Sequence, residues 1–327
     1  MALEIAVASG KGGVGKSTVS SALAIYLHRK DYDVIAVDAD ADAPNLHLVL
    51  EVDKWEKEEW FEDAWISEID YSKCTNCGIC AEVCPYEAVE LTGNKYTINP
   101  VICEGCLTCI LACPEKAIRR VKTGRGYVRL AKTRYGFPLW MAELLPGRPN
   151  TGKLVTEIKN RAKAMARENT IIVVDSAAGI GCQVISSLAG ANAAILVTEP
   201  TPAGLSDLKR VHTIAKQFLL PSALIINKYD INPEYLDKIL AYAKEENIDV
   251  LGMIPYDDHV PAAIAKMKHP IKLYPDSPAA KALLDISRKV ENTIVRNWRE
   301  WARRHMPRKP VHYTPILIKP REIGARR

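Results

Sequence analysis

The sequence lacks the long apolar segments of an integral membrane protein. No run of about 18 apolar residues occurs in its 327 residues, so we expect no helix that spans a bilayer. The first residues lead directly into an apolar strand pattern, without the basic and apolar leader of a secretory signal. These two absences predict a cytoplasmic protein. Glutamine is also scarce, with only Gln183 and Gln217, a bias found in heat-adapted proteins.

Cysteine, by contrast, is plentiful, with nine residues. Cytosolic thiols rarely form disulfides, so metal or cluster binding is the expected use of these side chains. The net charge of +5 is spread unevenly. The segment Arg296–Arg327 has ten basic and two acidic residues, a balance of +8, which leaves the rest of the chain at −3. The basic character of the chain therefore belongs to its C-terminal tail.

A glycine-rich turn between an apolar strand and a helical pattern predicts a phosphate-binding loop. The stretch Ser9–Thr18 reads Ser-Gly-Lys-Gly-Gly-Val-Gly-Lys-Ser-Thr and follows the expected strand Leu3–Ala8. Glycines let the backbone aim its N–H groups at phosphate oxygens, and the positive end of the next helix adds to the attraction. Lys16 is expected to neutralise the β- and γ-phosphates, and Ser17 to hold Mg²⁺. The expected nucleotide ligands are Gly10, Lys11, Gly12, Gly13, Val14, Gly15, Lys16, Ser17 and Thr18.

Lys11 is a second lysine that an ordinary phosphate loop does not need. Its early position resembles the deviant loop of the MinD, ParA and nitrogenase iron protein superfamily. That resemblance implies a doubly wound, mostly parallel α/β sheet, ATP with Mg²⁺ as the ligand, and a homodimer with nucleotide at its interface. It also implies that Lys11 of one subunit reaches the phosphates of the other, so that Lys11 and Lys16 both act in catalysis. A solvated Lys11 is the alternative.

Alternating acidic residues follow the second expected strand, Asp33–Val37, at the sheet edge where α/β proteins bind ligands. Asp38, Asp40 and Asp42 resemble switch I of that superfamily. By this resemblance Asp40 orients or deprotonates the attacking water and Asp38 lies close to Mg²⁺. Asp42 is a rival for either role. A turn that caps a helix is the structural alternative.

Two further strand ends add expected nucleotide contacts. Asp175 follows the strand Thr170–Val174 and resembles the Walker B and switch II element, which implies a Mg²⁺ contact through water. Asn227 opens the tetrapeptide Asn-Lys-Tyr-Asp, whose aspartate contacts guanine in guanine-nucleotide proteins. The deviant loop favours the other use, a contact of Asn227 with adenine. Pro255 is expected to flank the base.

Eight of the nine cysteines form two runs of identical spacing. Cys-x-x-Cys-x-x-Cys-x-x-x-Cys-Pro occupies residues 74–85 and recurs 29 residues later at 103–114. The duplication matches the bacterial two-cluster ferredoxins, in which the fourth cysteine of each run ligates the other cluster. Zinc is the alternative for any one Cys-x-x-Cys pair. One [4Fe–4S] cluster is expected on Cys74, Cys77, Cys80 and Cys113, and a second on Cys103, Cys106, Cys109 and Cys84.

The ninth cysteine, Cys182, lies seven residues after Asp175. A ligand of the subunit-bridging cluster of the nitrogenase iron protein lies at a similar offset. That protein supplies two cysteines per subunit, so the resemblance does not extend to a complete bridging cluster here. We expect Cys182 to be a buried small side chain, with a docking thiol for a transferred cluster and a redox handle as alternatives.

Other elements are expected from apolar runs and helix signals. Strands are expected at 127–133, 137–145, 193–197 and 223–226, and a surface segment at 51–70. Helices are expected from Lys153 to Arg167 and from Ser277, as N-cap, to about His305. The end of the last helix is basic with tryptophans on one face. Packing of these tryptophans on the body, and peripheral membrane contact, are the two interpretations of that pattern.

These signals divide the chain into four expected segments. An ATPase domain at 1–69 and 123–292 is interrupted by an α+β two-cluster ferredoxin domain at 70–122 and followed by a basic amphipathic tail at 293–327. The expected function is ATP-gated electron transfer from the clusters to a redox or iron–sulfur acceptor protein. An assembly or carrier ATPase for iron–sulfur clusters or metallocofactors is the first alternative, and a MinD-like membrane-associated positioning ATPase the second. Nucleic acid is not an expected partner.

Overall fold

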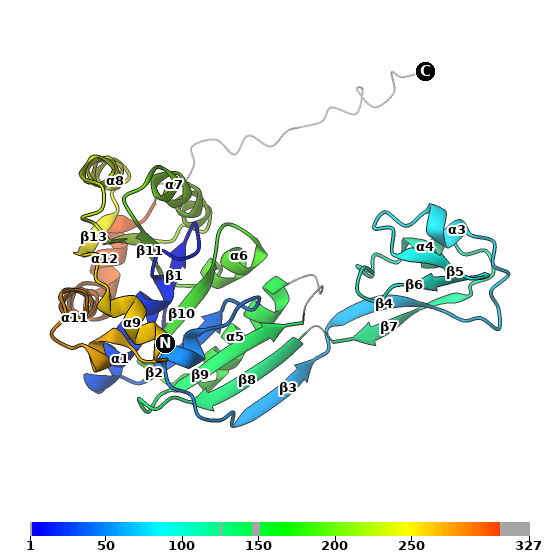
Figure 1. Cartoon of the computed structure of the whole chain (residues 1–327), viewed down its shortest axis with the longest axis horizontal. Coiled ribbons are helices and arrows are strands. Elements are labelled where there is room, and N and C mark those ends of the chain that lie inside the picture. The colour runs from blue at the N-terminus through cyan, green and yellow to red at the C-terminus, as the bar shows by residue number, and fades with distance from the viewer. Residues whose placement is uncertain (1, 125, 146–150, 308–327) are drawn as a thin grey trace, which may run out of the picture.

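The computed structural model describes residues 2–124, 126–145 and 151–307. A nine-stranded sheet with helices on both faces forms the larger body, and a smaller lobe extends from one edge of that sheet (Figure 1). We call residues 64–123 the small lobe and the remaining described residues the body. The strands of the large sheet, in spatial order, are β13 (Asp249–Ile254), β12 (Ser222–Asn227), β11 (Ala193–Thr198), β1 (Leu3–Ser9), β10 (Ile171–Ala178), β2 (Val34–Ala39), β9 (Pro138–Leu144), β8 (Gly126–Lys132) and β3 (Lys57–Phe61).

The large sheet is parallel over most of its width. Strands from β13 to β9 all pair in parallel, whereas β8 is antiparallel to β9 and β3 is antiparallel to β8. Central strands such as β1 and β2 are apolar and buried along nearly their whole length, as a sheet covered on both faces requires. The doubly wound, mostly parallel sheet expected from the sequence is therefore confirmed. Part of the expected surface segment 51–70 forms the edge strand β3, which is exposed along nearly its whole length.

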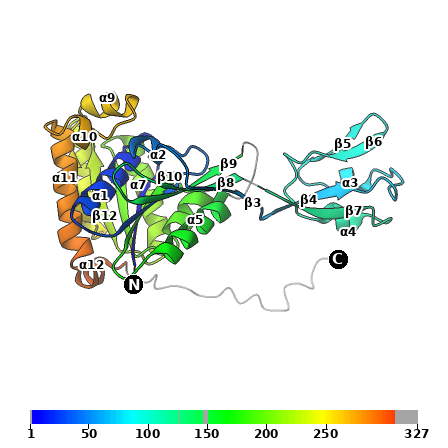
Figure 2. The same cartoon turned by 90° about the horizontal axis from the view of Figure 1, so that it is seen from below.

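Helices cover the sheet in two layers (Figure 2). On one face, α1 (Lys16–Arg29) and α11 (Pro278–Val290) pack over one apolar cluster; on the other, α5 (Thr151–Met165), α6 (Cys182–Leu188), α7 (Pro202–Gln217) and α8 (Pro233–Glu245) pack over a second. Shorter helices are α2 (Leu46–Val49), α9 (His259–Ala265) and α10 (Pro270–Leu273). Helix α11 starts as expected, because the Ser277 hydroxyl accepts a hydrogen bond from the N–H of Ala280 at 3.3 Å.

The last helix does not run unbroken to His305 as expected. A π-helical turn, Glu291–Val295, interrupts it before α12 (Trp298–His305). The buried carboxylate of Glu291 anchors the wider turn by accepting hydrogen bonds from the hydroxyls of Tyr26 and Tyr32.

The aromatic face of α12 packs on the body. Trp301 is 5% exposed and donates from Nε1 to Asp249 Oδ2 at 2.9 Å. This contact supports the interpretation in which the tryptophans pack on the body, rather than the one in which they contact a membrane. Residues 308–327 of the tail lie outside the described chain. Across the described helices, the structure contains no segment of the length and hydropathy that would cross a bilayer.

The small lobe is built from a duplicated β-α-β unit. Its elements are β4 (Ala64–Ile69), α3 (Ile79–Glu82) and β5 (Val89–Thr92), then β6 (Lys95–Ile98), α4 (Thr108–Ala112) and β7 (Ile118–Thr123). Strand β4 pairs with β7 and β5 pairs with β6, so each small sheet takes one strand from each unit. The first unit begins at Ala64, ahead of the boundary expected at residue 70.

The backbone of the small lobe repeats as its sequence does. Left-handed φ angles recur 29 residues apart, at Asn76 and Gly105 (62° and 63°), Gly78 and Leu107 (83° and 68°), and Glu87 and Lys116 (52° and 50°). Non-glycine residues adopt such angles at a cost, so the surrounding structure must enforce them. The two cysteine runs therefore share these left-handed backbone positions.

Candidate functional site

The phosphate loop lies between β1 and α1, as predicted. Gly15 has a φ of 91°, and a Cβ at this position would lie 2.4 Å from the side-chain nitrogen of Asn227. That nitrogen donates to the carbonyl of Val14 at 2.9 Å. Asn227, at the end of β12, thus braces the loop from across the sheet, which a larger residue at position 15 would prevent.

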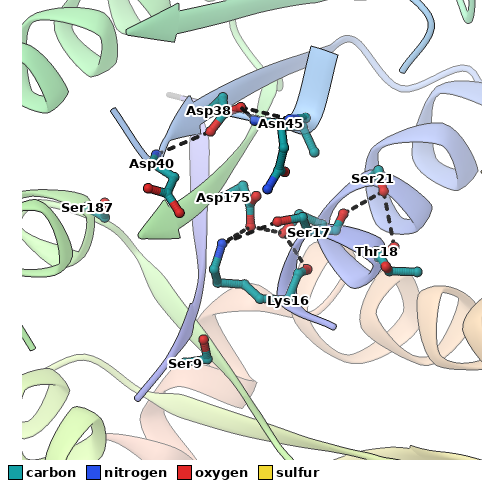
Figure 3. Close-up of polar contacts among 12 residues, drawn as sticks. Ser9, Lys16, Ser17, Thr18, Ser21, Asp38, Asp40, Asn45, Asp175 and Ser187 are labelled. Carbon is teal, nitrogen blue, oxygen red and sulfur yellow. Dashed lines mark hydrogen bonds and ion pairs between the residues drawn. The ribbon is translucent and has the colours of Figure 1, made fainter. Parts of the chain in front are cut away.

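Lys16 and Asp175 meet at the centre of the site (Figure 3). Lys16 is 7% exposed, and its Nζ lies 2.8 Å from Asp175 Oδ1, which also accepts from the Ser20 hydroxyl at 2.8 Å. Within the described chain, the second oxygen of Asp175 is buried without a hydrogen-bond partner. A buried carboxylate oxygen without a partner is costly, and Mg²⁺ or a water held by it would satisfy this atom.

Asp38 lies beside Asp175 because β2 and β10 pair in that register. Its carboxylate is fully buried and accepts from the backbone N–H groups of Asp40, Asn45 and Leu46 at 3.2, 3.0 and 2.8 Å. Burial, and next the neighbouring Asp175 carboxylate, raise the pKa of Asp38 to about 7. Asp38 therefore shapes the turn before α2 and lies beside the expected Mg²⁺ site.

The two remaining acidic residues of this turn differ in their surroundings. Partial burial raises the pKa of Asp40, and the charge of Lys16 acts in the opposite direction. The carboxylate of Asp42 instead accepts a hydrogen bond from Gln183 Nε2 at 2.5 Å. Asp40 is thus influenced by the charge of Lys16 in the phosphate loop, whereas Asp42 is hydrogen-bonded to Gln183 of α6. No motif or spacing in the sequence pointed to Gln183.

Lys11 pairs with an acidic residue that the sequence analysis did not single out. Its Nζ lies 2.7 Å from Glu199 Oε1, and Lys228 Nζ lies 3.0 Å from Glu199 Oε2. Burial alone would raise the pKa of Glu199, but the hydrogen bonds from Lys11 and Lys228 outweigh it and lower the pKa. Glu199 directly follows β11, so its position after a strand end was the signal that could have identified it.

The Asn-Lys-Tyr-Asp segment joins the loop that contains Pro255. Asp230 Oδ1 accepts from the N–H of Tyr256 at 2.8 Å, and the N–H of Tyr229 donates to the carbonyl of Ile254 at 3.1 Å. Asp230 therefore holds a neighbouring loop in place. Asn227 and Pro255 are brought to the same end of the sheet, beside the phosphate loop.

Two cavities in the small lobe are lined by the expected cysteine sets. The lining of the first includes Cys74, Cys77, Cys80 and Cys113. The lining of the second includes Cys84, Cys103, Cys106 and Cys109. Each cavity thus takes three cysteines from one run and the fourth from the other.

Backbone groups and small apolar residues surround these cavities. The N–H of Ala88 points to Cys84 Sγ and that of Ala117 to Cys113 Sγ, both at 3.3 Å. Burial raises the pKa of Cys109, whose thiol donates to the Ser67 hydroxyl at 3.3 Å. Across the described part of the chain, no group of three His, Cys, Asp or Glu side chains is arranged to hold a single metal ion.

Cys182 is exposed, so the expectation of a buried side chain is wrong. It begins α6 directly after the turn that contains Gly179, which has a φ of 98°. This turn emerges at the protein surface, where Ile180 and Ile185 are also exposed. The general tendency of free cysteine to be buried therefore does not hold at this position.

Comparisons with known proteins agree with this architecture. The model of the CobQ/CobB/MinD/ParA nucleotide binding domain matches residues 5–271. An uncharacterized protein of Methanocaldococcus jannaschii is 36% identical over 265 residues, which cover 80% of this chain and 88% of that protein. The iron-sulfur cluster carrier protein of Pyrococcus horikoshii is 28% identical over 302 residues, which cover 89% of this chain and 86% of that protein.

A solved structure shows the same fold. The cell division ATPase MinD of Pyrococcus furiosus aligns with a TM-score of 0.55 at 21% identity, over 89% of this chain and 99% of that one. The phosphate loop, the acidic strand ends and the parallel sheet are thus those of a known group of nucleotide-binding proteins. The chain belongs to the CobQ/CobB/MinD/ParA family of P-loop ATPases.

Proposed function

We propose that this chain is an ATP-hydrolysing iron–sulfur protein, in which rearrangement of an ATP-bound homodimer gates electron transfer from the small lobe to a partner protein. The observation that carries the proposal is the pair of cysteine-lined cavities in a lobe attached to a P-loop ATPase. When bound, [4Fe–4S] clusters supply one-electron redox chemistry at low potential. The chain's own residues supply the rest: binding sites, orientation and shielding from water.

The donor sets fit four-iron clusters better than zinc. A zinc ion draws four ligands to about 2.3 Å from one point, whereas each cysteine of a [4Fe–4S] cluster binds a different iron and stays farther from the others. Four cysteines line each cavity, three from one run and the fourth from the other, which is the ligand arrangement of two-cluster ferredoxins. Buried Ala88 and Ala117 keep the inner walls apolar, which lowers water access.

The nucleotide roles follow from the contacts around Lys16. A bound phosphate would replace Asp175 as the partner of Lys16, and would free the Asp175 carboxylate to orient the water shell of Mg²⁺ with Ser17 and Asp38. Asp40 is assigned to orient the attacking water, since partial burial raises the pKa of its carboxylate and makes it a better proton acceptor than an ordinary aspartate. The base would lie beside Asn227 and Pro255.

Adenine is the proposed base because Asp230 already accepts from the N–H of Tyr256. In the guanine interpretation that carboxylate would have to bind the base instead. Competition between ATP and GTP for the protein tests this assignment, and equal affinity for the two would contradict it.

Dimer formation requires Lys11 to change partners. Lys11 is paired with Glu199 of its own chain, and its side chain is 35% exposed. To reach the phosphates bound by a second subunit it must leave this ion pair, and the γ-phosphate offers a stronger negative partner. Lys228 remains to pair with Glu199 when Lys11 departs.

Electron paramagnetic resonance of the anaerobically purified, reduced protein, with and without Mg-ATP, tests the proposal. We expect signals from two clusters, and faster electron transfer to a soluble dye acceptor with Mg-ATP. The Lys16→Gln variant should show both signals but no effect of ATP. Equal transfer rates with and without ATP would contradict gating. An iron-free protein that is folded and binds nucleotide would contradict the cluster assignment.

A second candidate function is delivery of a cluster to an acceptor protein. Relatives named iron-sulfur cluster carrier protein, and the exposed thiol of Cys182 beside the ATPase site, favour it. Incubation of the iron-loaded protein with an apo-ferredoxin, followed by separation and iron analysis, distinguishes the two. Transfer that requires ATP and is lost in Cys182→Ala supports delivery, whereas iron that stays bound through many turnovers excludes it.

A further inference from the structure

Gln183 joins two parts of the ATPase site that are far apart in sequence. It is the second residue of α6 and is 7% exposed. Its side-chain oxygen accepts from the N–H of Ala41 at 2.9 Å, and its nitrogen donates to Asp42 Oδ2 at 2.5 Å. Both polar atoms of a buried amide are thus satisfied by one short stretch of chain, the turn 40–42.

The turn 40–42 is held on several sides. Asp38 Oδ1 accepts from the N–H of Asp40 at 3.2 Å, and the carbonyl of Ala41 accepts from the N–H of Leu144 at 2.8 Å. These contacts fix the turn to β2 and β9. Among the side-chain contacts of the described residues, those of Gln183 connect the turn to α6, the helix that follows Asp175 and Gly179.

We propose that Gln183 is a positioning residue for ATP hydrolysis. It fixes Asp40 relative to the turn that contains Gly179 and directly precedes α6. The inference rests on the role proposed above for Asp40. Because Gln183 contacts Ala41 and Asp42, the two residues that follow Asp40 in the turn, a shift of the N-terminus of α6 moves Asp40 with it. Gly179 lies in the turn before α6, and its positive φ is one that glycine adopts without strain. A shift of α6 would therefore begin in this turn.

The test is the steady-state ATPase rate of Gln183→Ala. We expect kcat to fall by about 10- to 100-fold with KM for Mg-ATP within about twofold, since small misplacement of a catalytic group has such an effect on the chemical step. Gln217→Ala is the matched control, because Gln217 is the other glutamine of the chain and is exposed at the end of α7. Its kcat should equal that of the unmodified protein.

Combination with Asp40→Asn separates positioning from general damage. If Gln183 acts through Asp40, Gln183→Ala should reduce kcat no further in the Asp40→Asn background. A full additional loss of kcat in that background would overturn the inference, as would an unchanged kcat in the single variant. If Asp40→Asn alone keeps full kcat, the role proposed for Asp40 fails first, so the two failures are distinguishable.

Hydrogen exchange of the nucleotide-free protein provides a readout that does not depend on catalysis. The amide of Ala41 should lose protection in Gln183→Ala, because its hydrogen-bond acceptor is removed. Exchange in the central strand β10 should be unchanged, which would show that the body is still folded. Equal protection of Ala41 in both proteins would contradict the positioning contact.

Discussion

The body and the small lobe obtain their stability in different ways. The body buries two large apolar clusters, one on each face of its sheet, with members such as Leu23, Leu139 and Val174 that are hardly exposed. The buried cluster of the small lobe consists of Ile69, Cys109 and Ile118, so one of its core residues is an expected cluster ligand. A core of that size stabilises little on its own. From this comparison we expect the body to use nucleotide for activity, and the lobe to depend on the proposed clusters to fold.

Iron removal should have the largest effect, and it should be confined to the small lobe. After chelation under anaerobic conditions, we expect amide exchange in residues 64–123 to accelerate by about 10³-fold or more, because metal binding and folding are coupled in such small domains. Strands β1 and β10 of the body should keep their protection. Exchange measured by mass spectrometry provides the comparison. Equal protection of the lobe before and after chelation would show that its own core is sufficient.

Loss of the nucleotide should leave both parts folded. Lys16→Gln removes the charge that binds phosphate but keeps a donor for the buried Asp175 carboxylate. We expect ATP affinity to fall by about 10- to 100-fold, the range for a lost hydrogen bond to a charged group. Lys54→Gln, at an exposed surface lysine, is the control. Calorimetric titration measures the affinity, and visible absorption reports the cluster content, which should not change. A loss of clusters in Lys16→Gln would break the separation of body and lobe.

Binding of Mg²⁺ to the body should depend on pH through Asp38. Its pKa of about 7 lies above the ordinary carboxyl value, so the folded, metal-free protein keeps a proton on Asp38 that the unfolded chain has lost. The contribution of Asp38 to stability therefore falls as pH rises from about 4 to 7. Mg²⁺ requires the ionised form, so its affinity in the presence of ADP should rise by up to about tenfold per pH unit below 7 and level off above.

The variant Asp38→Asn is the control for this titration. Without an ionisable group at that position, the dependence of Mg²⁺ affinity on pH should flatten between pH 6 and 8. The measurement is a Mg²⁺ titration of the ADP complex at several pH values. A slope that persists in Asp38→Asn would assign the proton to Asp175 or Asp40 instead.

Local motifs made much of this architecture predictable. The phosphate loop and its flanking strand and helix could be predicted because their residues are contiguous, and the cysteine runs because their duplication fixes their spacing. The role of Gln183 could not, because its partner Ala41 lies 142 residues away, and the pairing of Glu199 with Lys11 could not, because 188 residues separate them and no spacing rule applies. The exposure of Cys182 was missed for a related reason. The burial of free cysteine is a statistical tendency, whereas the exposure of this thiol depends on the direction of the turn before α6.

The smallest expected effect distinguishes the two halves of the small lobe from each other. Ser67, on β4, is 3% exposed and contacts Cys109 Sγ at 3.3 Å. The equivalent position in the second unit is Tyr96, so the two cavities differ in their polar surroundings. A cluster-bound cysteine has no proton, so the Ser67 hydroxyl must be the donor, and such hydrogen bonds stabilise the more negative, reduced state.

Ser67→Ala should therefore lower the reduction potential of one cluster and leave the other unchanged. A hydrogen bond of about 1 kcal/mol corresponds to about 40 mV for a one-electron couple. Redox titration followed by electron paramagnetic resonance measures both potentials in one sample. Ser72→Ala is the control. The Ser72 hydroxyl donates to Asp70 at 2.6 Å, and among the described residues it makes no hydrogen bond to a sulfur. A shift of both potentials, or of neither, would show that the two halves are equivalent toward their clusters, and that the difference between Ser67 and Tyr96 concerns packing alone.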